Sequence, residues 1–278
     1  MKLLIYISLI LLFLQGCTAN SKVDLDIPSI KHTTSLQIEE SNTTDINSDE
    51  EFFEDDDSNF DDEFDEEEKE IYDPLYKYNT LMTNVNDTIF TYLLNPISKG
   101  YHLLLPNATQ ESITNLFHNI KFPIRLVNNL LQGKFKNSFE ESERFLINST
   151  VGIAGLFDPA KTYLNIQAHN EDFGQTLGYY GVGAGIHVVL PIWGPSNLRD
   201  IVGLSVDGYL SPIVYQKNLD DYRIPNTYAE SIAIYSLDII NKNALHLGAY
   251  ESLKKDAIEL YPFLRDIYEQ KRTSDIED

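Results

Sequence analysis

Residues 73–94 read DPLYKYNTLMTNVNDTIFTYLL, and the spacing of apolar residues in this stretch decides the fold class. Large apolar side chains recur every three or four positions, at Leu75, Tyr78, Met82, Val85, Ile89 and Leu93. This period places them on one face of an α-helix. Pro96 follows the stretch, and because proline has no amide hydrogen to donate, it predicts an interruption of the helix.

The helical period returns along the rest of the chain. Further helices are expected at residues 107–120, 123–133, 138–146, 196–202, 228–239 and 250–260. Pro123 suits the first turn of its helix, and Gly133 suits the position after the last turn. No sustained alternation of apolar and polar residues indicates a strand. The sequence therefore predicts an all-α domain of six to nine helices.

Short polar side chains predict where some of these helices begin. Asn107 with Gln110, and Ser138 with Glu141, show the spacing of a capping box. In this pattern the first side chain accepts a hydrogen bond from the third residue of the helix. We therefore expect residues 107 and 138 to lie at helix starts.

The N-terminus has the layout of an exported and lipidated chain. Lys2 precedes an apolar run over residues 3–14, which is too short to span a bilayer well. The run ends in Leu14-Gln15-Gly16-Cys17, which resembles a bacterial lipobox. The resemblance implies that residues 1–16 are a signal peptide and that Cys17 is acylated. Thr18 at the next position favours the outer membrane, and the alternative is an ordinary secretory signal that a cysteine follows by chance.

Residues 17–70 are expected to form a disordered acidic tether behind the lipidated cysteine. They are rich in Ser, Thr, Asn, Asp and Glu and show no helical or strand period. Such a segment buries too little apolar surface to offset the entropy of ordering it. As a flexible coil it reaches on the order of 40 Å. A solvated spacer is the simplest interpretation, and docking on a basic partner or binding of divalent cations is the alternative.

Charge and cysteine content exclude several classes of function. The formal net charge is −22, and residues 49–70 alone contribute −14, with 15 acidic residues against one lysine. This balance argues against a nucleic-acid partner, because phosphates would be repelled. A single cysteine rules out an intramolecular disulfide and a cysteine-rich zinc site. No cofactor or metal is expected.

Residues 147–157 form the first of two apolar, glycine-containing stretches that do not suit a regular helix. Irregular apolar backbone needs its polar groups satisfied by neighbouring protein or by water in a cavity. The stretch is expected to act as a hinge or to line a channel; the alternative is a buried loop under helices. The candidate residues are Gly152, Gly155, Phe157, Asp158 and Pro159.

Residues 181–194 form the second stretch, which reads GVGAGIHVVLPIWG. It is expected to face the membrane, with Trp193 as an anchor at the interface. The alternative is that the lone tryptophan packs in the core. The candidate residues are Val188, Val189, Leu190, Ile192 and Trp193.

Ordered motifs between residues 73 and about 203 resemble the MlaA/VacJ lipoprotein family. They are Asp73-Pro74-Leu75, Asn84-Val85-Asn86, Asn95-Pro96-Ile97, residues 128–134 (NNLLQGK), residues 144–150 (RFLINST), residues 152–160 (GIAGLFDPA), residues 169–178 (HNEDFGQTLG), Leu190-Pro191, Gly194-Pro195-Ser196 and Leu198-Arg199-Asp200. Tyr76 departs from the family, which usually has Glu at this position, and the long acidic tether is a second departure.

The resemblance implies a fold and a function for residues 71–278. It implies a flat, ring-like assembly of amphipathic helices embedded in one leaflet of the outer membrane around an amphipathic channel. It implies removal of mislocalised phospholipids from the outer leaflet, which maintains lipid asymmetry. The implied partners are phospholipids, an outer-membrane porin trimer, and a periplasmic lipid carrier that feeds an inner-membrane ABC transporter. The implied location is the outer membrane, with the lipid anchor on its periplasmic side.

Two other functions are alternatives. His169, Glu171 and Asp172 are the one cluster that invites acid–base or metal chemistry, but neither a G-x-S-x-G elbow nor an HExxH motif accompanies it. We instead expect Asn170 to cap a helix, with the two carboxylates near its positive end, and no enzymatic activity. The second alternative is a scaffold lipoprotein that tethers a porin without moving lipid.

Overall fold

The computed structural model describes residues 73–217 and 222–278, which belong to one compact unit, Tyr72–Asp278. Every regular element in these ranges is a helix, and β-pairing is limited to two isolated bridges, His187–Asn197 and Leu190–Gly194. The all-α prediction is confirmed. The predicted signal peptide, Cys17 and the acidic tether lie outside the described residues.

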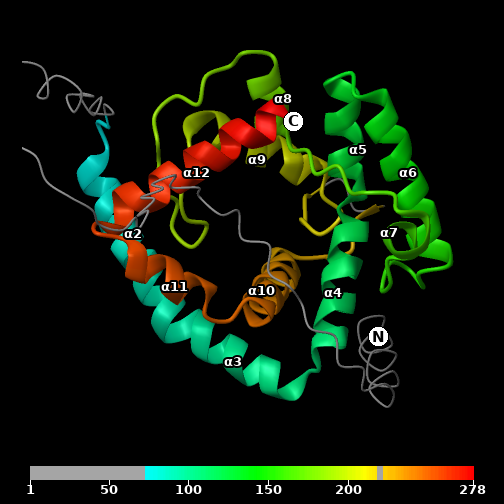
Figure 1. Ribbon diagram of the computed structural model, residues 1–278, viewed down its shortest axis with the longest axis horizontal. Coiled ribbons are helices and arrows are strands. Elements are labelled where there is room, and N and C mark those ends of the chain that lie inside the picture. The colour runs from blue at the N-terminus through cyan, green and yellow to red at the C-terminus, as the bar shows by residue number, and fades with distance from the viewer. Residues whose placement is uncertain (1–72, 218–221) are drawn as a thin grey trace, which may run out of the picture. The chain divides into compact units, whose positions relative to one another are not determined.

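The described ranges contain eleven α-helices and one π-helical turn, more than the six to nine helices expected, because several short helices carry no clear period (Figure 1). In chain order they are α2 (Tyr76–Ile89), η1 (Phe90–Leu94), α3 (Asn95–Leu104), α4 (Asn107–Ile120), α5 (Phe122–Leu131), α6 (Phe135–Thr150), α7 (Pro159–Leu164), α8 (Phe173–Tyr179), α9 (Leu198–Leu210), α10 (Tyr228–Leu245), α11 (Ala249–Asp256) and α12 (Leu260–Glu277). None of them combines the length and the hydropathy that crossing a membrane requires.

Pro96 does not interrupt its helix, so that prediction is wrong. The helical path runs from α2 through the π-turn η1 into α3, and Pro96 lies in the first turn of α3. In the π-turn the amide of Asn95 bonds to the carbonyl of Phe90, five residues back. The wider turn accommodates the proline ring, which in a regular helix clashes with the carbonyl four residues earlier.

Both predicted capping boxes are also wrong. Ser138 and Glu141 lie inside α6 and are buried. Asn107 is the first residue of α4, which has no side-chain cap, and the buried Gln110 amide donates to the carbonyl of Leu105 at 2.7 Å. Ser138, Glu141 and Gln110 thus lie in the interior of the protein instead of capping helix ends, whereas Asn107 is exposed.

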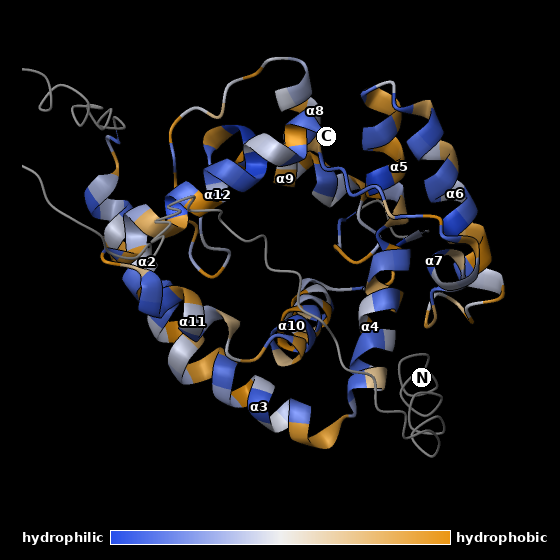
Figure 2. Cartoon of the chain, viewed as in Figure 1, coloured by the Kyte–Doolittle hydropathy of each residue, from blue (hydrophilic) through white to orange (hydrophobic). Residues whose placement is uncertain are grey.

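Polar side chains fill the interior, and apolar side chains cover much of the exterior. On α6 the buried positions are Ser138, Glu141, Arg144 and Asn148, which recur at helical spacing. Phe139 on the same helix is exposed. Figure 2 shows this mixture, with hydrophilic and hydrophobic residues alternating along single helices.

The same distribution, with polar side chains inside and apolar ones outside, holds throughout the residues that the structure describes. Its buried residues comprise 27 polar or charged side chains and only seven hydrophobic ones, while 37 large hydrophobic residues are exposed. The apolar core is a small cluster of Ile113, Phe117 and Ile213. Hydrogen bonds and ion pairs between buried side chains therefore take a large part in joining the helices, in contrast with the usual apolar core.

Contacts between helices follow one another in a defined order (Figure 1). Helix α10 packs against α3 and α4, and α4 contacts α5 and α6. Helix α5 packs along α6 and also contacts α8 and α9, which pack on each other. The C-terminal helix α12 contacts both α8 and α2, so it links the end of the chain to the start of the domain.

Candidate functional site

A cavity of about 420 Å³ is bordered by residues of α4, α5, α8, α10 and α12 and by the segment before α8. This volume lies within the roughly 300–1,000 Å³ typical of small-molecule sites. Phe117 and Ile124 give the wall an apolar part. Lys121, Arg125 and Lys242 bring positive charge to it.

One wall of the cavity rests on a buried ion pair between α5 and α6. The Arg125 Nε lies 2.7 Å from Oε2 of Glu141, which is fully buried. Arg125 also donates to the carbonyl of His118 at 2.7 Å, and Glu141 accepts from the backbone amide of His169 at 2.7 Å. Burial and the nearby Arg125 charge lower the pKa of His118 to about 4, so its imidazole is neutral at pH 7.

A second wall carries two lysines that share one carboxylate. The Nζ atoms of Lys121 and Lys242 lie 2.5 and 3.1 Å from Oδ2 of Asp238, which is buried. Burial lowers the pKa of Lys121, and repulsion by Lys242 lowers it further. One negative charge thus faces two positive charges at the edge of the cavity.

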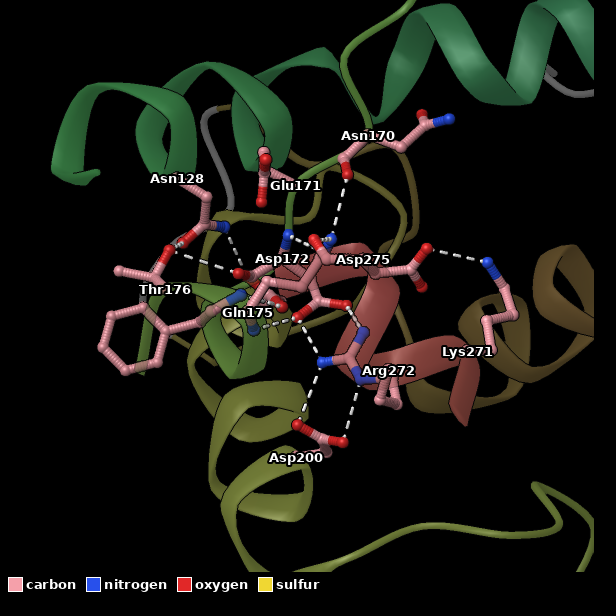
Figure 3. A network of polar contacts seen from close by, with 12 residues as sticks. Asn128, Asn170, Glu171, Asp172, Gln175, Thr176, Asp200, Lys271, Arg272 and Asp275 are labelled. Carbon is pink, nitrogen blue, oxygen red and sulfur yellow. Dashed lines mark hydrogen bonds and ion pairs between the residues drawn. The ribbon is translucent and has the colours of Figure 1, made fainter. Parts of the chain in front are cut away.

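Arg272 of α12 joins α8 to α9 (Figure 3). Its guanidinium donates to both carboxylate oxygens of Asp172 at 2.8 and 2.9 Å and to both oxygens of Asp200 at 2.9 and 3.0 Å. Burial alone would raise the pKa of Asp200, but Arg272, Arg199 and Tyr268 outweigh it and hold that pKa at about 2. Asp200 therefore stays ionised throughout the physiological pH range.

A chain of hydrogen bonds connects α5, α8 and α9 beside this cluster. The Thr176 hydroxyl donates to Oδ1 of Asn128 at 2.9 Å, and the Asn128 amide donates to Asp207 at 3.0 Å. The second carboxylate oxygen of Asp207 accepts from the backbone amide of Phe173 at 3.0 Å. Polar groups thereby link three helices to one another.

Asp207 makes the stability of the fold depend on pH. Burial raises its pKa from 3.8 to about 6, and the Asp172 charge adds to the shift. The folded state therefore binds this proton more tightly, so the stabilisation is complete below pH 3.8 and is lost as pH rises through 6. We expect the loss to be about 3 kcal/mol.

Asp207→Asn should remove this dependence. Unfolding free energies measured for both proteins at pH 4, 5, 6 and 7 in detergent should show the wild type losing its advantage over the variant as pH rises. A difference that stays constant over this range would show that the Asp207 pKa is not raised.

The predicted hinge segment is tightly packed. A side-chain carbon at Gly152 would lie 2.4 Å from the carbonyl oxygen of Asn148, and one at Gly155, where φ is +91°, would lie 2.4 Å from the Asn119 side chain. Phe157 is exposed. The role of this segment as a hinge or channel lining stays a prediction, and substitutions at these glycines would disturb folding as well as motion.

Asp158 and Pro159 start helix α7. Oδ1 of Asp158 accepts from the Lys161 amide, and Pro159 occupies the first turn. Arg144 lies 2.6 Å from the other oxygen of Asp158, and the Asn148 amide donates to Oδ1 at 2.9 Å. These bonds tie the end of the predicted hinge to α6.

The structure buries one part of the predicted membrane-facing segment and exposes another. The prediction is wrong for Val189, which is 1% exposed because its backbone amide is drawn inward to the Asn79 side chain at 2.9 Å. Val188 and Leu190 are half-buried. Ile192 and Trp193 are 61% and 54% exposed, and their contact with membrane stays a prediction.

Two asparagines of α2 hold this segment. The Asn79 amide donates to the carbonyl of His187 at 3.0 Å, while its oxygen accepts the Val189 amide. Asn86, two turns along the helix, donates to the Leu190 carbonyl at 2.9 Å and accepts the Ile192 amide at 2.7 Å. Each asparagine side chain thus forms hydrogen bonds with one amide and one carbonyl of the irregular backbone, as a neighbouring β-strand would. The seven-residue spacing of the two asparagines was the available signal in the sequence.

The His169, Glu171 and Asp172 cluster does not form a shared site. His169 contacts Glu140 at 2.6 Å, and Glu171 pairs with Lys134 at 2.7 Å. The cap of α8 is Asp172, in a capping box with Gln175, and not Asn170 as expected. The side chain of Asn170 is directed elsewhere, because its Oδ1 atom lies 3.1 Å from Nε2 of His118. In the described ranges, no group of three His, Cys, Asp or Glu residues is placed to hold a metal.

The fold and the interior define an all-α protein of inverted polarity, built around polar contacts and a charged cavity. A sequence model of the family described as MlaA lipoprotein matches residues 71–275. The chain belongs to the MlaA lipoprotein family.

Known relatives agree with this assignment. The intermembrane phospholipid transport system lipoprotein MlaA of Escherichia coli K12 is 28% identical over 202 residues, which are 72% of this chain and 76% of that protein. The Haemophilus influenzae protein of the same name is 34% identical over 143 residues, 50% of this chain and 57% of that protein. A chain solved in work on the structural basis for maintenance of bacterial outer membrane lipid asymmetry aligns with a TM-score of 0.63 and 26% identity, covering 74% of this chain and all of that one.

Proposed function

We propose that the protein removes mislocalised phospholipids from the outer leaflet of the outer membrane and passes them to a periplasmic lipid carrier. That carrier would feed an inner-membrane ABC transporter, and a porin trimer would be a further partner in the outer membrane. The names of the relatives from Escherichia coli and Haemophilus influenzae support a part in intermembrane phospholipid transport.

The inverted polarity carries this proposal. In water, a surface with 37 large exposed hydrophobic residues would be costly, whereas acyl chains accept it. In hydrocarbon, polar groups must find partners inside the protein, and here 27 polar side chains are buried. The same distribution that is unfavourable in water is therefore favourable in a membrane.

The order of helix contacts supports a ring-like arrangement of the helices. Helix α2 continues along the chain into α3, and α3 contacts α10. From α10 the contacts lead in turn to α4, α5, α8 and α12, and α12 contacts α2 again. A closed order of amphipathic helices permits apolar side chains to face lipid on the outside and polar side chains to line the inside. Such a lumen would be the amphipathic channel that the family resemblance implies.

Transport of phospholipid demands this combination of surfaces. Exposing a single acyl chain to water costs on the order of 10 kcal/mol at about 0.8 kcal/mol per CH₂. A head group in hydrocarbon is costly as well, because its charges lose their solvation. A polar interior beside an apolar exterior shelters both parts of the lipid at once, and no chemical step is needed.

A transfer assay tests the function. The full-length chain in proteoliposomes that contain a fluorescent phospholipid should pass the intact lipid to albumin as a soluble acceptor, faster than protein-free vesicles do. Thin-layer chromatography should find no hydrolysis product. Hydrolysed lipid would indicate an enzyme, and the absence of both transfer and hydrolysis would indicate a scaffold; either result contradicts the proposal.

The anchor is a separate part of the proposal. We expect acylation of Cys17 to attach the protein to the periplasmic side of the outer membrane, because two or more acyl chains suffice for stable anchoring. Cys17→Ser should leave an unacylated precursor that retains residues 1–16. Mass spectrometry of the mature N-terminus checks this, and an unmodified Cys17 in the native host would contradict it.

A further inference from the structure

Lys121 and Lys242 place an uncompensated positive charge at the edge of the cavity. Both approach the same oxygen of Asp238, at 2.5 and 3.1 Å, so two positive charges meet one negative charge and one positive charge is in excess. The second oxygen of Asp238 is buried and has no hydrogen-bond partner within the described ranges. The pair of lysines therefore has the capacity to attract a further anion.

The other charged groups around the cavity are already paired. Arg125 is neutralised by Glu141 at 2.7 Å, and Lys271 by Asp275 at 2.9 Å. Glu171 and Asp172 are held by Lys134 at 2.7 Å and by Arg272 at 2.8 Å. His118 is neutral at pH 7, because its pKa is lowered to about 4 by burial and by Arg125. The excess positive charge consequently stays with the two lysines.

Apolar groups lie directly beside this charge. The Lys121 ammonium lies 5.9 Å from the centre of the Phe117 ring, and Phe117 and Ile124 both line the cavity. A ligand that suits the cavity therefore has an anionic group next to an apolar part. The phosphodiester of a phospholipid, which joins the head group to glycerol and its acyl chains, has this arrangement.

We propose that the cavity between α4, α5, α10 and α12 binds the phosphate of a phospholipid, with Lys121 and Lys242 as its ligands. This inference rests on the proposed function and adds a binding site within the lipid path. Lys242 is half exposed and free to move toward the phosphate, whereas Lys121 is partly buried and stays with Asp238. An anion between the lysines offsets their mutual repulsion, which also lowers the pKa of Lys121.

Lys242→Gln is the decisive variant, because Asp238 keeps its bond to Lys121 and the fold retains its buried pair. Titration calorimetry of the full-length chain in an uncharged detergent would use dihexanoylphosphatidylglycerol as the phosphate-containing probe. The loss of one charge-assisted hydrogen bond should weaken binding about tenfold. Lys242→Arg should bind nearly as the wild type does. Lys136→Gln, which removes an exposed lysine from an equivalent i,i+4 pair, should have no effect.

A second variant changes binding in the opposite direction. Asp238→Asn removes the competing carboxylate, so we expect it to bind the phosphatidylglycerol probe more tightly. Dihexanoylglycerol, which lacks the phosphate, should bind the wild type and Lys242→Gln equally.

Three results would overturn the inference. They are unchanged affinity of Lys242→Gln for the phosphatidylglycerol probe, an equal loss for dihexanoylglycerol, and inorganic phosphate binding as tightly as the lipid, which would make free phosphate the ligand. Lipid transfer separates this inference from the proposed function. Normal transfer with any of these results refutes only the site, whereas a wild type that transfers no lipid refutes the function.

Discussion

Arg125→Met is expected to lower the free energy of unfolding by about 3 to 5 kcal/mol. The substitution leaves the carboxylate of Glu141 fully buried with no cationic partner, and an uncompensated buried charge is among the most destabilising changes known in proteins. It also removes the hydrogen bond from the Arg125 guanidinium to the carbonyl of His118. Denaturant titration in detergent micelles, followed by helical circular dichroism, measures the loss.

The double variant Arg125→Met, Glu141→Met shows whether the charge is the cause. With both charges removed, the pair is replaced by apolar side chains of similar size, which often restores stability. The double variant should therefore be more stable than Arg125→Met alone. Lys136→Met, which breaks an exposed pair with Glu140, should cost less than about 1 kcal/mol. A double variant that is less stable than the single variant would contradict the role assigned to the buried charge.

Arg272→Met is expected to cost about 3 kcal/mol. Its guanidinium is the shared partner of Asp172 and Asp200, so its removal leaves two carboxylates facing each other between α8 and α9 (Figure 3). Asp200 is buried and keeps only Arg199 and Tyr268 as partners, whereas Asp172 loses its cationic partner but is partly exposed, so that water compensates for some of its loss. Because α12 is anchored here, its amides should also exchange hydrogen faster in the variant.

The neighbouring residue supplies a matched control. Lys271→Met removes a positive charge from the adjacent position of the same helix, but its pair with Asp275 is exposed. Such pairs contribute less than about 1 kcal/mol. Equal losses for Lys271→Met and Arg272→Met would show that charge on α12 matters in general and that the clamp between the two aspartates does not.

The helices were predictable from sequence, but the direction in which they face was not. The apolar stripe of α2 was found from its period, and the structure confirms a helix at this place. The residues that α2 buries are Asn79 and Thr83, however, while Leu81 and Leu93 on the helical path are exposed. The period of the sequence shows that the helix has one apolar and one polar face. Which face turns outward depends on the medium that surrounds the protein. In this protein the polar face of the helix turns inward.

The same inversion explains why local patterns failed. Ser138 and Glu141 have capping-box spacing, but this spacing also places them on one face of α6, where Glu141 meets Arg125. The loop at residues 187–192 was recognised as unusual, whereas its attachment to Asn79 and Asn86 depends on contacts more than 100 residues apart. The seven-residue spacing places the two asparagines on one face of the helix, but nothing local in the sequence indicates which backbone they bind.

Membrane insertion of the helical domain itself is tested most directly by flotation of residues 71–278 with phospholipid vesicles. This fragment lacks the signal peptide, Cys17 and the acidic tether, so only its own surface can hold it in a membrane. We expect it to float with the vesicles on a density gradient, to need detergent for extraction, and to carry phospholipid through purification. A monomeric, lipid-free fragment that stays in the aqueous layer would contradict the central claim that its apolar exterior faces acyl chains.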